Sequence, residues 1–416
     1  MKHLFASIIT IGDELLIGQV IDTNSAWMAT ELNKIGVFVK HRIAVGDVWD
    51  DIWQALDEES KHADIILITG GLGPTADDIT KPLLCEYFNG KMVVDEATLA
   101  HVTHIFEHIL KRPMIERNRK QAEVPDVCTV LKNEKGTAPG MLFEKNGKTF
   151  ISLPGVPHEM KWIMTNHVLP FIPSKYKTPY ILHKTLLTAG IGESFLAELI
   201  QEEENALPDY IKLAYLPNYG MVRLRLTASS YDKTELESTL NKHFDLLKQK
   251  VAPYLVIDDD ISLQEAIGKM LLAKHATIAT AESCTGGYIA HLLTSIPGSS
   301  AYFNGSIVSY NNTIKTQVLG VPTEILETVG AVSEETVTIM AKSVLKIMNT
   351  DYAIAVSGIM GPTGATAEKP VGMVWIAVAN KEKTIAKRFD FRFDRERNIQ
   401  LTAINSLNEL RLLICG

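Results

Sequence analysis

Cysteine is scarce in this chain of 416 residues, which contains only Cys85, Cys128, Cys284 and Cys415. Four widely spaced thiols do not make the disulfide framework of a small secreted domain. No H-E-x-x-H motif and no paired Cys/His spacing indicates a zinc site. We therefore expect reduced thiols and a cytoplasmic protein.

Long apolar runs and basic runs are also missing. No apolar stretch reaches the roughly 18 residues that a membrane-spanning helix needs. The first apolar run, Leu4 to Ile11, leads into Asp13 and Glu14 with no small-residue cleavage site, which favours a β-strand over a signal peptide. The formal net charge of -8 and the lack of a Lys/Arg run argue against direct binding of nucleic acid or of a membrane surface.

What the chain does contain is an alternation of short apolar runs with amphipathic helical patterns. The length exceeds the size at which one hydrophobic core keeps growing, so several domains are expected. Proline-rich and acidic turns divide the chain into residues 1–172, 173–256 and 257–416. We predict an α/β fold class, with two α/β domains that have mainly parallel sheets, joined by a small α+β domain.

Within the first domain, the apolar runs predict strands near residues 5–12, 37–46 and 64–71, and helices over 24–36 and 95–113. One face of the second helix should carry Leu99, Val102, Phe106 and Ile109. In the middle domain, the alternation over residues 222–226 predicts a strand with one wet face. In the last domain, strands are expected near residues 276–281, 305–310, 352–358 and 372–379, before a long helix from about Arg397.

Three segments of the last domain carry candidate chemistry. The segment ATAESCTGGYIAHLLT runs from a strand into a helix with Ser283 at the junction, NGSIVSYNNTIKTQVLGV holds Tyr310 and Lys315, and VSGIMGPTGATAEKPVGMVW is a glycine-rich loop between strands. Each has an ordinary structural interpretation: a helix N-cap, a core ring beside a solvated amine, and a turn. From spacing alone, those interpretations stay open.

Together, the three segments suggest amide hydrolysis. A serine hydroxyl attacks an amide poorly unless a base removes its proton, and a lysine serves when burial lowers its pKa. A tyrosine can orient or relay that proton. Amide N–H groups at the helix start can hold an oxyanion or a phosphate, with Gly286 and Gly287 allowing close approach. The loop from Gly358 to Gly372 could cradle a second anionic part of the substrate.

The motifs AESCTGG, VSYNNTIK and GPTGATAEKPVG resemble the C-terminal domain of the CinA family, a nicotinamide mononucleotide amidohydrolase with a Ser/Tyr/Lys constellation. The resemblance implies Ser283 as nucleophile, Lys315 as base, Tyr310 as its partner, and no metal at this site. The substrate-binding residues that it implies are Thr285, Gly286, Gly287, Gly358, Gly361, Thr363 and Arg395.

The chain departs from the family pattern in two places. Relatives commonly carry GPGGG where this chain has GPTGA at residues 361–365, so its loop has fewer glycines. Ile399 stands where many relatives have a further arginine, which bears on the assignment of Arg395 to the substrate phosphate. Cys284 is a rival nucleophile, because a thiolate at a helix N-terminus can attack, although no histidine lies within the motif to activate it.

In the first domain, the ordered motifs TIGDELLIGQVIDTNS, LITGGLGPTADDITK, NRKQAEVPD, NEKGTAPGM and LPGVPHEM resemble the molybdopterin-binding fold, and more closely the CinA N-terminal branch with metal-dependent ADP-ribose pyrophosphatase activity. Backbone amides near glycines after a strand can approach phosphates. The expected substrate-binding residues are Asn24, Thr69, Gly70, Gly71, Gly73, Thr75, Gly155, Pro157 and Glu159.

Carboxylates at strand ends of this domain suit a divalent cation, Mg, Mn or Co. The expected ligands are Asp13, Glu14, Asp77 and Asp78. The competing interpretation is that Asp77 and Asp78 cap a helix while Asp13 and Glu14 open another at its positive end. Spacing alone does not separate the two interpretations.

The middle domain resembles the KH-like connector of the same family. A KH fold raises the possibility of RNA binding through a GXXG loop. This segment has GIGES, lacks GXXG with basic flanks, and is acidic at Glu202 to Glu204, so we expect a spacer or a dimer element. The family resemblance implies a homodimer.

The resulting expectation is a bifunctional hydrolase of pyridine-nucleotide salvage, acting on nicotinamide mononucleotide and ADP-ribose. One rival is a non-catalytic pterin- or nucleotide-binding module, favoured if the first domain binds no metal. Another is an interaction protein in competence or DNA-damage response. The acidic charge and the lack of a DNA-binding motif count against direct DNA contact.

Overall fold

The computed structural model describes residues 4–75 and 78–416. By internal contacts the chain divides into two compact units, residues 1–182 with 228–237 and residues 183–227 with 238–416. Within the described residues, no helix combines the length and the apolar character needed to cross a membrane.

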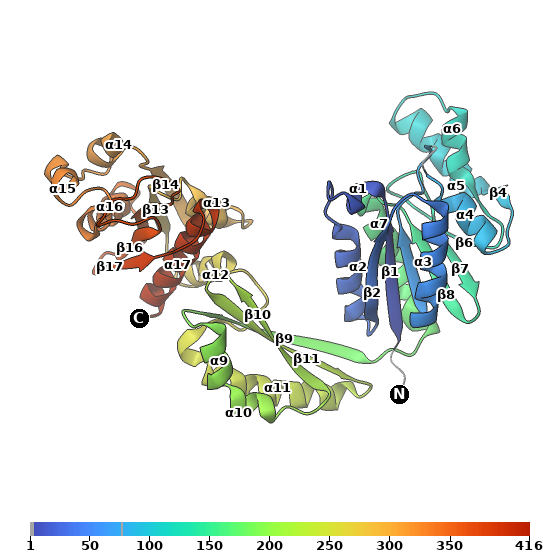
Figure 1. The fold of residues 1–416 in the computed structure, drawn as a ribbon, viewed down its shortest axis with the longest axis horizontal. Helices are drawn as coiled ribbons and strands as arrows, with labels where there is room; N and C mark the ends of the chain where they lie inside the picture. The colour runs from blue at the N-terminus through green and yellow to red at the C-terminus, as the bar shows by residue number, and fades with distance from the viewer. Residues whose placement is uncertain (1–3, 76–77) are drawn as a thin grey trace. The chain divides into compact units, whose positions relative to one another are not determined.

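The first unit is built on a six-stranded sheet in the order β2-β1-β3-β8-β7-β6 (Figure 1). Its strands are β1 (Phe5–Ile11), β2 (Phe38–Val45), β3 (Ile65–Thr69), β6 (Thr129–Leu131), β7 (Gly140–Lys145) and β8 (Lys148–Leu153). The four strands β2, β1, β3 and β8 run parallel, whereas β7 and β6 pair antiparallel. The predicted α/β class and the three predicted strands are confirmed.

Helices cover both faces of this sheet, because successive strand side chains point to opposite faces. Ile8 packs with Met28 and Met160, whereas its neighbour Ile9 packs with Leu56 and Leu84. The helices on the Ile8 face are α2 (Thr23–Lys34), α7 (Pro157–Ile163) and α8 (Leu169–Lys175), and those on the Ile9 face are α3 (Trp49–His62) and α4 (Thr80–Tyr87). A short helix, α1 (Asp13–Leu16), follows β1 directly.

One predicted helix face is wrong in part. The α5 helix (Glu96–His104) continues as a π-helical turn over Ile105–Ile109, so the 3.6-residue periodicity does not extend to the end. Val102 is buried as expected, but Ile109 is 64% exposed. The remaining elements around it are β4 (Met92–Val94), α6 (Glu116–Arg119) and β5 (Glu123–Pro125).

A four-stranded sheet in the order β10-β11-β9-β12 forms the middle part of the chain. Its elements are β9 (Tyr180–Ala189), α9 (Glu193–Leu199), α10 (Gln201–Asn205), β10 (Ile211–Asn218), β11 (Met221–Ser230), α11 (Lys233–Lys250) and β12 (Leu255–Ile257). The predicted alternation is confirmed, because Leu224 is buried while Arg223 and Arg225 are partly exposed. Lys250 pairs with Glu202 at 3.7 Å and Glu203 at 3.4 Å.

The last part holds a five-stranded sheet in the order β14-β13-β15-β16-β17. Its strands are β13 (Ile278–Glu282), β14 (Phe303–Val308), β15 (Tyr352–Gly358), β16 (Met373–Asn380) and β17 (Thr384–Asp390). The neighbours β14, β13 and β15 run parallel, and β16 and β17 add antiparallel pairs. The four predicted strands are confirmed, whereas β17 was not among the predictions.

The two faces of this sheet differ in side-chain size. On one face, larger side chains such as Ile354 and Val356 pack against α12 (Leu263–Ala273), α13 (Tyr288–Thr294) and α17 (Arg395–Cys415). On the other face, α16 (Glu334–Ile347) packs on a row of small side chains, Ala279, Ala281, Ala353, Ala355, Ala377 and Ala379. The short helices α14 (Asn312–Gln317) and α15 (Thr323–Thr328) follow β14.

Candidate functional site

The carboxyl ends of three parallel strands bring the predicted C-terminal residues together. Ser283 follows β13, Tyr310 and Lys315 follow β14, and Gly358 ends β15. The Ser283 N–H donates to the Val356 carbonyl at 3.0 Å. Ligands of open α/β sheets bind beyond this edge. Residues separated by 75 positions in the sequence therefore share one edge of the sheet.

Lys315 lies on α14 and is a buried amine, not the solvated amine of the ordinary interpretation. Its side chain is 1% exposed, and its Nζ donates to the carbonyl oxygens of Ser309 at 2.7 Å and Tyr310 at 3.4 Å. Burial disfavours the charged ammonium and lowers the pKa of Lys315. Ser283 is buried to a similar degree, at 8% exposure.

Tyr310 is an exposed ring, not a core ring, and it is tied to the glycine-rich loop through Arg395. Arg395, the first residue of α17, donates to the Tyr310 hydroxyl at 3.0 Å and to the Gly361 carbonyl at 2.9 Å. Tyr310 is 61% exposed. Thr363, beyond Gly361 on the loop, is exposed. The structure thus joins Tyr310, Arg395 and Gly361, all predicted from the sequence.

Gly361 is held by its surroundings as well as by Arg395. Its φ is +83°, and a Cβ there would lie 2.6 Å from Cγ1 of Val371. The fully buried Asn398 donates from Nδ2 to the neighbouring Met360 carbonyl at 3.1 Å. The loop is therefore anchored to the start of α17. A simple turn between two strands would not need these contacts.

The helix-start amides are not available as the sequence suggested. Ser283 is not an N-cap, because α13 begins at Tyr288 and its N-cap is Gly287. The amides of Gly287, Ile289 and Ala290 donate to the Glu282 carboxylate, at 3.1, 3.0 and 2.8 Å. The expectation that these amides would face a substrate is wrong.

Cys284 is buried, and burial raises the pKa of its thiol to about 12. A thiol with this pKa is protonated at neutral pH and is a poor nucleophile. The charges of Lys315 and Arg395 act in the opposite direction, which places both cations near the turn that follows β13. The rival assignment of Cys284 as the nucleophile therefore loses its physical basis.

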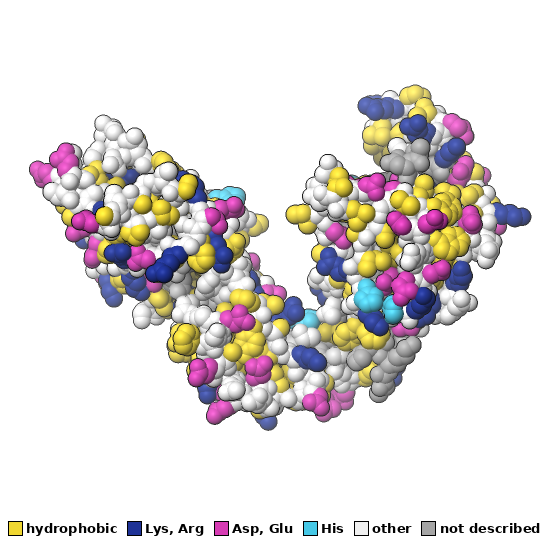
Figure 2. All heavy atoms as spheres, in the orientation of Figure 1, with side chains coloured by type: hydrophobic (Ala, Val, Ile, Leu, Met, Phe, Trp, Pro, Cys, Tyr) yellow, Lys and Arg dark blue, Asp and Glu magenta, His cyan; other side chains and the backbone are white. Residues whose placement is uncertain are grey.

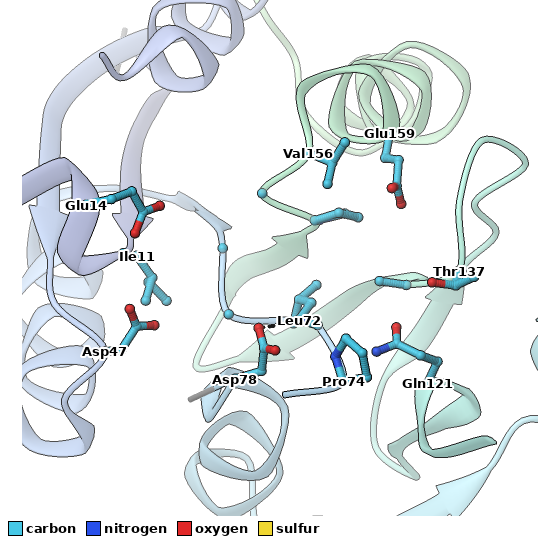
Figure 3. A pocket seen from close by; sticks show the side chains of 17 residues that line it. Ile11, Glu14, Asp47, Leu72, Pro74, Asp78, Gln121, Thr137, Val156 and Glu159 are labelled. Carbon is cyan, nitrogen blue, oxygen red and sulfur yellow. Dashed lines mark hydrogen bonds between the residues drawn. The ribbon is translucent and has the colours of Figure 1, made fainter. Parts of the chain in front are cut away.

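In the N-terminal unit, a cavity of about 410 Å³ lies beyond the ends of β1, β3 and β8 (Figure 3). Predicted residues that line it are Glu14, Gly70, Gly71, Gly73, Asp78, Gly155 and Glu159. A smaller cavity of about 140 Å³ shares Glu14 and Gly155 and is also lined by Asn24, Thr69 and Pro157. The Asn24 amide donates to the Gly155 carbonyl at 2.7 Å. Asp13 and Thr75 line neither cavity.

Glycine is required where the backbone of this cavity turns. Gly71 has a φ of +63°, and a Cβ there would lie 2.1 Å from the Thr80 hydroxyl oxygen. Gly70 has a φ of +117°, and its Cβ would lie 2.2 Å from the Ile11 carbonyl oxygen. These positions let the chain pass close to its neighbours at the cavity wall.

Two of the carboxylates predicted as metal ligands, Asp78 and Asp13, have structural partners. Asp78 accepts from the amides of Gly73 and Thr75, both at 2.8 Å, and so closes its loop instead of capping α4. Asp13 lies in the first turn of α1, as the competing interpretation states, and accepts from the Asp47 amide at 3.2 Å. Asp77 lies outside the described residues.

No three His, Cys, Asp or Glu side chains of the described residues gather closely enough to hold one metal ion. Glu14 and Asp47 stand on one side of the cavity and Glu159 on the other (Figure 3). Glu159 accepts from the Asn133 amide at 2.6 Å. The carboxylates line the same cavity but do not form a complete set of metal ligands.

Sequence reasoning missed several residues of this cavity, including Gln121, Asp47 and Thr137. Gln121 is 2% exposed, and its Oε1 has no hydrogen-bond partner within the described chain. The backbone carbonyl of Gln121 accepts from the Nζ of the buried Lys81 at 2.7 Å, and burial lowers the pKa of Lys81 to about 8. The motif NRKQAEVPD contains Gln121, but nothing in its spacing marks that side chain.

The chain has two α/β parts with polar groups at strand ends, and a small sheet comes between them in the sequence. These features define a multidomain α/β protein with two candidate small-molecule sites. The probable molybdopterin binding domain matches residues 7–174, the damage-inducible protein CinA KH domain 183–256, and the CinA C-terminal domain 260–414. The chain belongs to the CinA family.

Full-length relatives support this assignment. A CinA-like protein of Cytophaga hutchinsonii is 47% identical over 98% of both chains, and one of Flavobacterium psychrophilum is 46% identical over 97% of both. Among solved structures, the chain also matches in part the crystal structure of the competence damage-inducible protein A from Klebsiella pneumoniae, at 33% identity and a TM-score of 0.36, over 37% of this chain and 96% of that chain.

Proposed function

We propose that the C-terminal site hydrolyses the carboxamide of nicotinamide mononucleotide to nicotinate mononucleotide and ammonia. The observation that carries the proposal is the buried amine of Lys315, with its lowered pKa, at the strand edge that also holds Ser283. A neutral amine has a lone pair that can accept the proton of a serine hydroxyl. An exposed lysine would remain charged and could not act as the base.

In the proposed reaction, Ser283 Oγ attacks the carboxamide carbon while its proton passes to Lys315 Nζ. The carbonyl electrons move to oxygen, where backbone amides of the turn after β13 stabilise the oxyanion. Collapse breaks the carbon–nitrogen bond, and the departing group takes the proton from Lys315 and leaves as ammonia. Water then hydrolyses the ester, giving the carboxylate and free Ser283, with no metal in any step.

Arg395 and Tyr310 form the substrate-binding side of this proposal. The guanidinium of Arg395 supplies a positive charge and planar donors suited to a phosphate group. Its existing contacts, the Tyr310 hydroxyl and the Gly361 carbonyl, tie that charge to the phenol and to the loop. A phosphate that binds Arg395 would therefore compete with the hydrogen bonds that Arg395 donates to Tyr310 and to the loop.

The test follows both products in the intact chain with and without a chelator. Equimolar ammonia and nicotinate mononucleotide, unaffected by EDTA and lost in Lys315→Met, are expected. Activity retained in Lys315→Met would refute Lys315 as the base. A product other than nicotinate mononucleotide would refute the reaction itself.

We further propose that the N-terminal cavity splits ADP-ribose and water into AMP and ribose 5-phosphate. The glycine-lined wall and the carboxylates Glu14 and Asp78 support this assignment. Mg²⁺ is commonly held by one or two carboxylates, substrate phosphates and water, so a protein cage of three ligands is not required. Such a cation would neutralise phosphate charge, with Glu14 as its carboxylate ligand, while Asp78 would hold the neighbouring loop through the amides of Gly73 and Thr75.

This second activity is tested by product release with added Mg²⁺, Mn²⁺ or Co²⁺ in the full chain. Glu14→Gln and Asp78→Asn should lower turnover, and Ser283→Ala should leave it unchanged. Tight ADP-ribose binding without turnover under every metal would favour the non-catalytic nucleotide-binding module. Retention of the chain on DNA at low salt would instead favour the interaction-protein rival. Lys/Arg and Asp/Glu side chains are interspersed on the face that Figure 2 shows, which does not favour binding to the phosphate backbone of DNA.

A further inference from the structure

Glu282 is a fully buried carboxylate immediately before Ser283, and the proposed reaction does not use it. Its side chain is surrounded by hydrogen-bond donors. The groups that donate to it are the amides of Gly287, Ile289 and Ala290 and the hydroxyls of Thr280, Thr285 and Ser306, at 2.7–3.5 Å. Each of these partners can donate a hydrogen bond, so Glu282 is the acceptor at the centre of the cluster.

These contacts replace the usual cap of a helix. The first amides of an α-helix have no partner inside the helix, and a side chain at the N-cap commonly accepts from them. Here the N-cap is Gly287, which has no side chain, and Glu282 reaches the amides from the preceding strand instead. The helix start and the nucleophile turn are therefore fixed by one carboxylate.

The same contacts determine which amides are left for a substrate. The Gly286 amide donates to the Ser283 carbonyl at 3.2 Å, and the Tyr288 amide to the Thr285 carbonyl at 3.1 Å. Within the described chain, no backbone carbonyl accepts from the amides of Cys284 and Thr285, although the Cys284 amide forms a hydrogen bond with its own thiol that lowers the pKa of that thiol. Both residues follow Ser283 directly in the sequence and lie in the turn that Glu282 holds.

We propose that Glu282 is a positioning residue of the amidohydrolase site. It withdraws the amides of α13 from the substrate and sets the turn so that the amides of Cys284 and Thr285 face the developing oxyanion. This inference rests on the proposed hydrolysis for its kinetic consequence, but the hold on the turn is a property of the chain alone. The role is positional, because no atom of Glu282 is exposed to a substrate.

The first test compares Glu282→Gln with Asp351→Asn in the full chain. The Asp351 carboxylate accepts from the Thr277 amide at 3.0 Å and from Lys381 at 2.9 Å, at the opposite end of the same sheet. In both substitutions, a carboxylate that accepts hydrogen bonds from the backbone is replaced by a side-chain amide of the same size. Glu282→Gln should lower kcat for nicotinamide mononucleotide by about 10- to 100-fold, because small displacements of reacting groups cost such factors. KM should change little, and Asp351→Asn should keep both constants.

A second measurement keeps the inference separate from the substrate assignment. Hydrogen exchange of peptides covering residues 283–290 should accelerate in Glu282→Gln and remain unchanged in Asp351→Asn. If the native chain releases no ammonia but this exchange pattern is found, the proposed function fails and the hold on the turn stands. Unchanged exchange over 283–290, or native kcat in Glu282→Gln, would overturn the positioning role.

Discussion

Arg395 donates a hydrogen bond to the Tyr310 hydroxyl at 3.0 Å, joining residues 85 positions apart in the sequence. A second donor of the same guanidinium binds the Gly361 carbonyl at 2.9 Å. Tyr310 is mostly exposed, so packing alone does not fix its ring. The contact makes Arg395 the link between the phenol that follows β14 and the loop that follows β15.

Loss of this link should weaken substrate binding. Hydrogen bonds to charged groups contribute about 1.5–3 kcal/mol, so Arg395→Met should raise KM for nicotinamide mononucleotide about 10- to 100-fold. Arg397→Met is the matched control, since Arg397 lies on the same helix but stacks over Phe393 at 4.0 Å. Steady-state kinetics checks this prediction, and an equal rise of KM in both variants would contradict it.

The pH dependence of the C-terminal reaction should report Lys315. Because burial lowers the pKa of Lys315, the neutral amine that acts as base forms at lower pH than in an exposed lysine. The value of kcat/KM should rise with pH and level off below the usual pKa of about 10.4. Lys315→Arg should be inactive across the profile, because arginine stays protonated. An active Lys315→Arg variant would exclude the lysine as base.

The strand ends could be predicted from the sequence, because apolar runs bounded by glycine and polar residues are local signals. Ser283, Tyr310, Lys315 and Gly358 follow or end predicted strands, and the structure places those strands side by side in one sheet. Parallel strands place their carboxyl ends at one edge, so strand order hardly matters for this inference. The hydrogen-bond partners of these side chains could not be predicted in the same way.

The choice of partners depends on three-dimensional contacts that no spacing reveals. Glu282 and Asp78 look like available acids in the sequence, yet both are occupied by backbone amides. Gln121 lines the N-terminal cavity from the turn after α6, where its backbone carbonyl accepts a hydrogen bond from Lys81, a residue 40 positions away. The π-helical turn after α5 likewise rotates Ile109 away from the face that a 3.6-residue period predicts.

Buried Lys81 should make stability depend on pH in a defined window. The pKa of Lys81 is about 8 in the folded chain and 10.5 for an unperturbed lysine, so between these values the unfolded chain binds the proton that the folded chain lacks. The free energy of unfolding should therefore rise with pH from about 8 to 10.5 through this group.

Urea unfolding at pH 8 and pH 9.5 measures this effect. Lys81→Met should remove part of the rise that the native chain shows. Lys61→Met serves as the control, because Lys61 is exposed and its hydrogen bond with Glu58 raises its pKa instead. A native-like rise in Lys81→Met would show that other groups produce it.

The wall of the N-terminal cavity should not tolerate a side chain at Gly71. Gly71→Ala combines a left-handed backbone with a clash against Thr80, at a cost of about 2–5 kcal/mol in unfolding free energy. Gly147→Ala has a φ of +75° and open space around its Cβ, so it should cost about 1–2 kcal/mol.

Denaturant unfolding and ADP-ribose binding of the two variants check this prediction together. Gly71→Ala should lose binding even under conditions where it remains folded, whereas Gly147→Ala should bind as the native chain does. Equal stability and equal binding in the two variants would mean that the glycine wall does not shape the cavity.

The most direct test of the central claim measures ammonia release from nicotinamide mononucleotide by the native chain, Ser283→Ala and Cys284→Ala. These neighbours lie in one turn, and burial raises the pKa of Cys284 to about 12, so only Ser283 should be needed. We expect Ser283→Ala to abolish ammonia release and still cleave ADP-ribose, and Cys284→Ala to retain ammonia release. Release that persists in Ser283→Ala, or that disappears only in Cys284→Ala, would contradict the account.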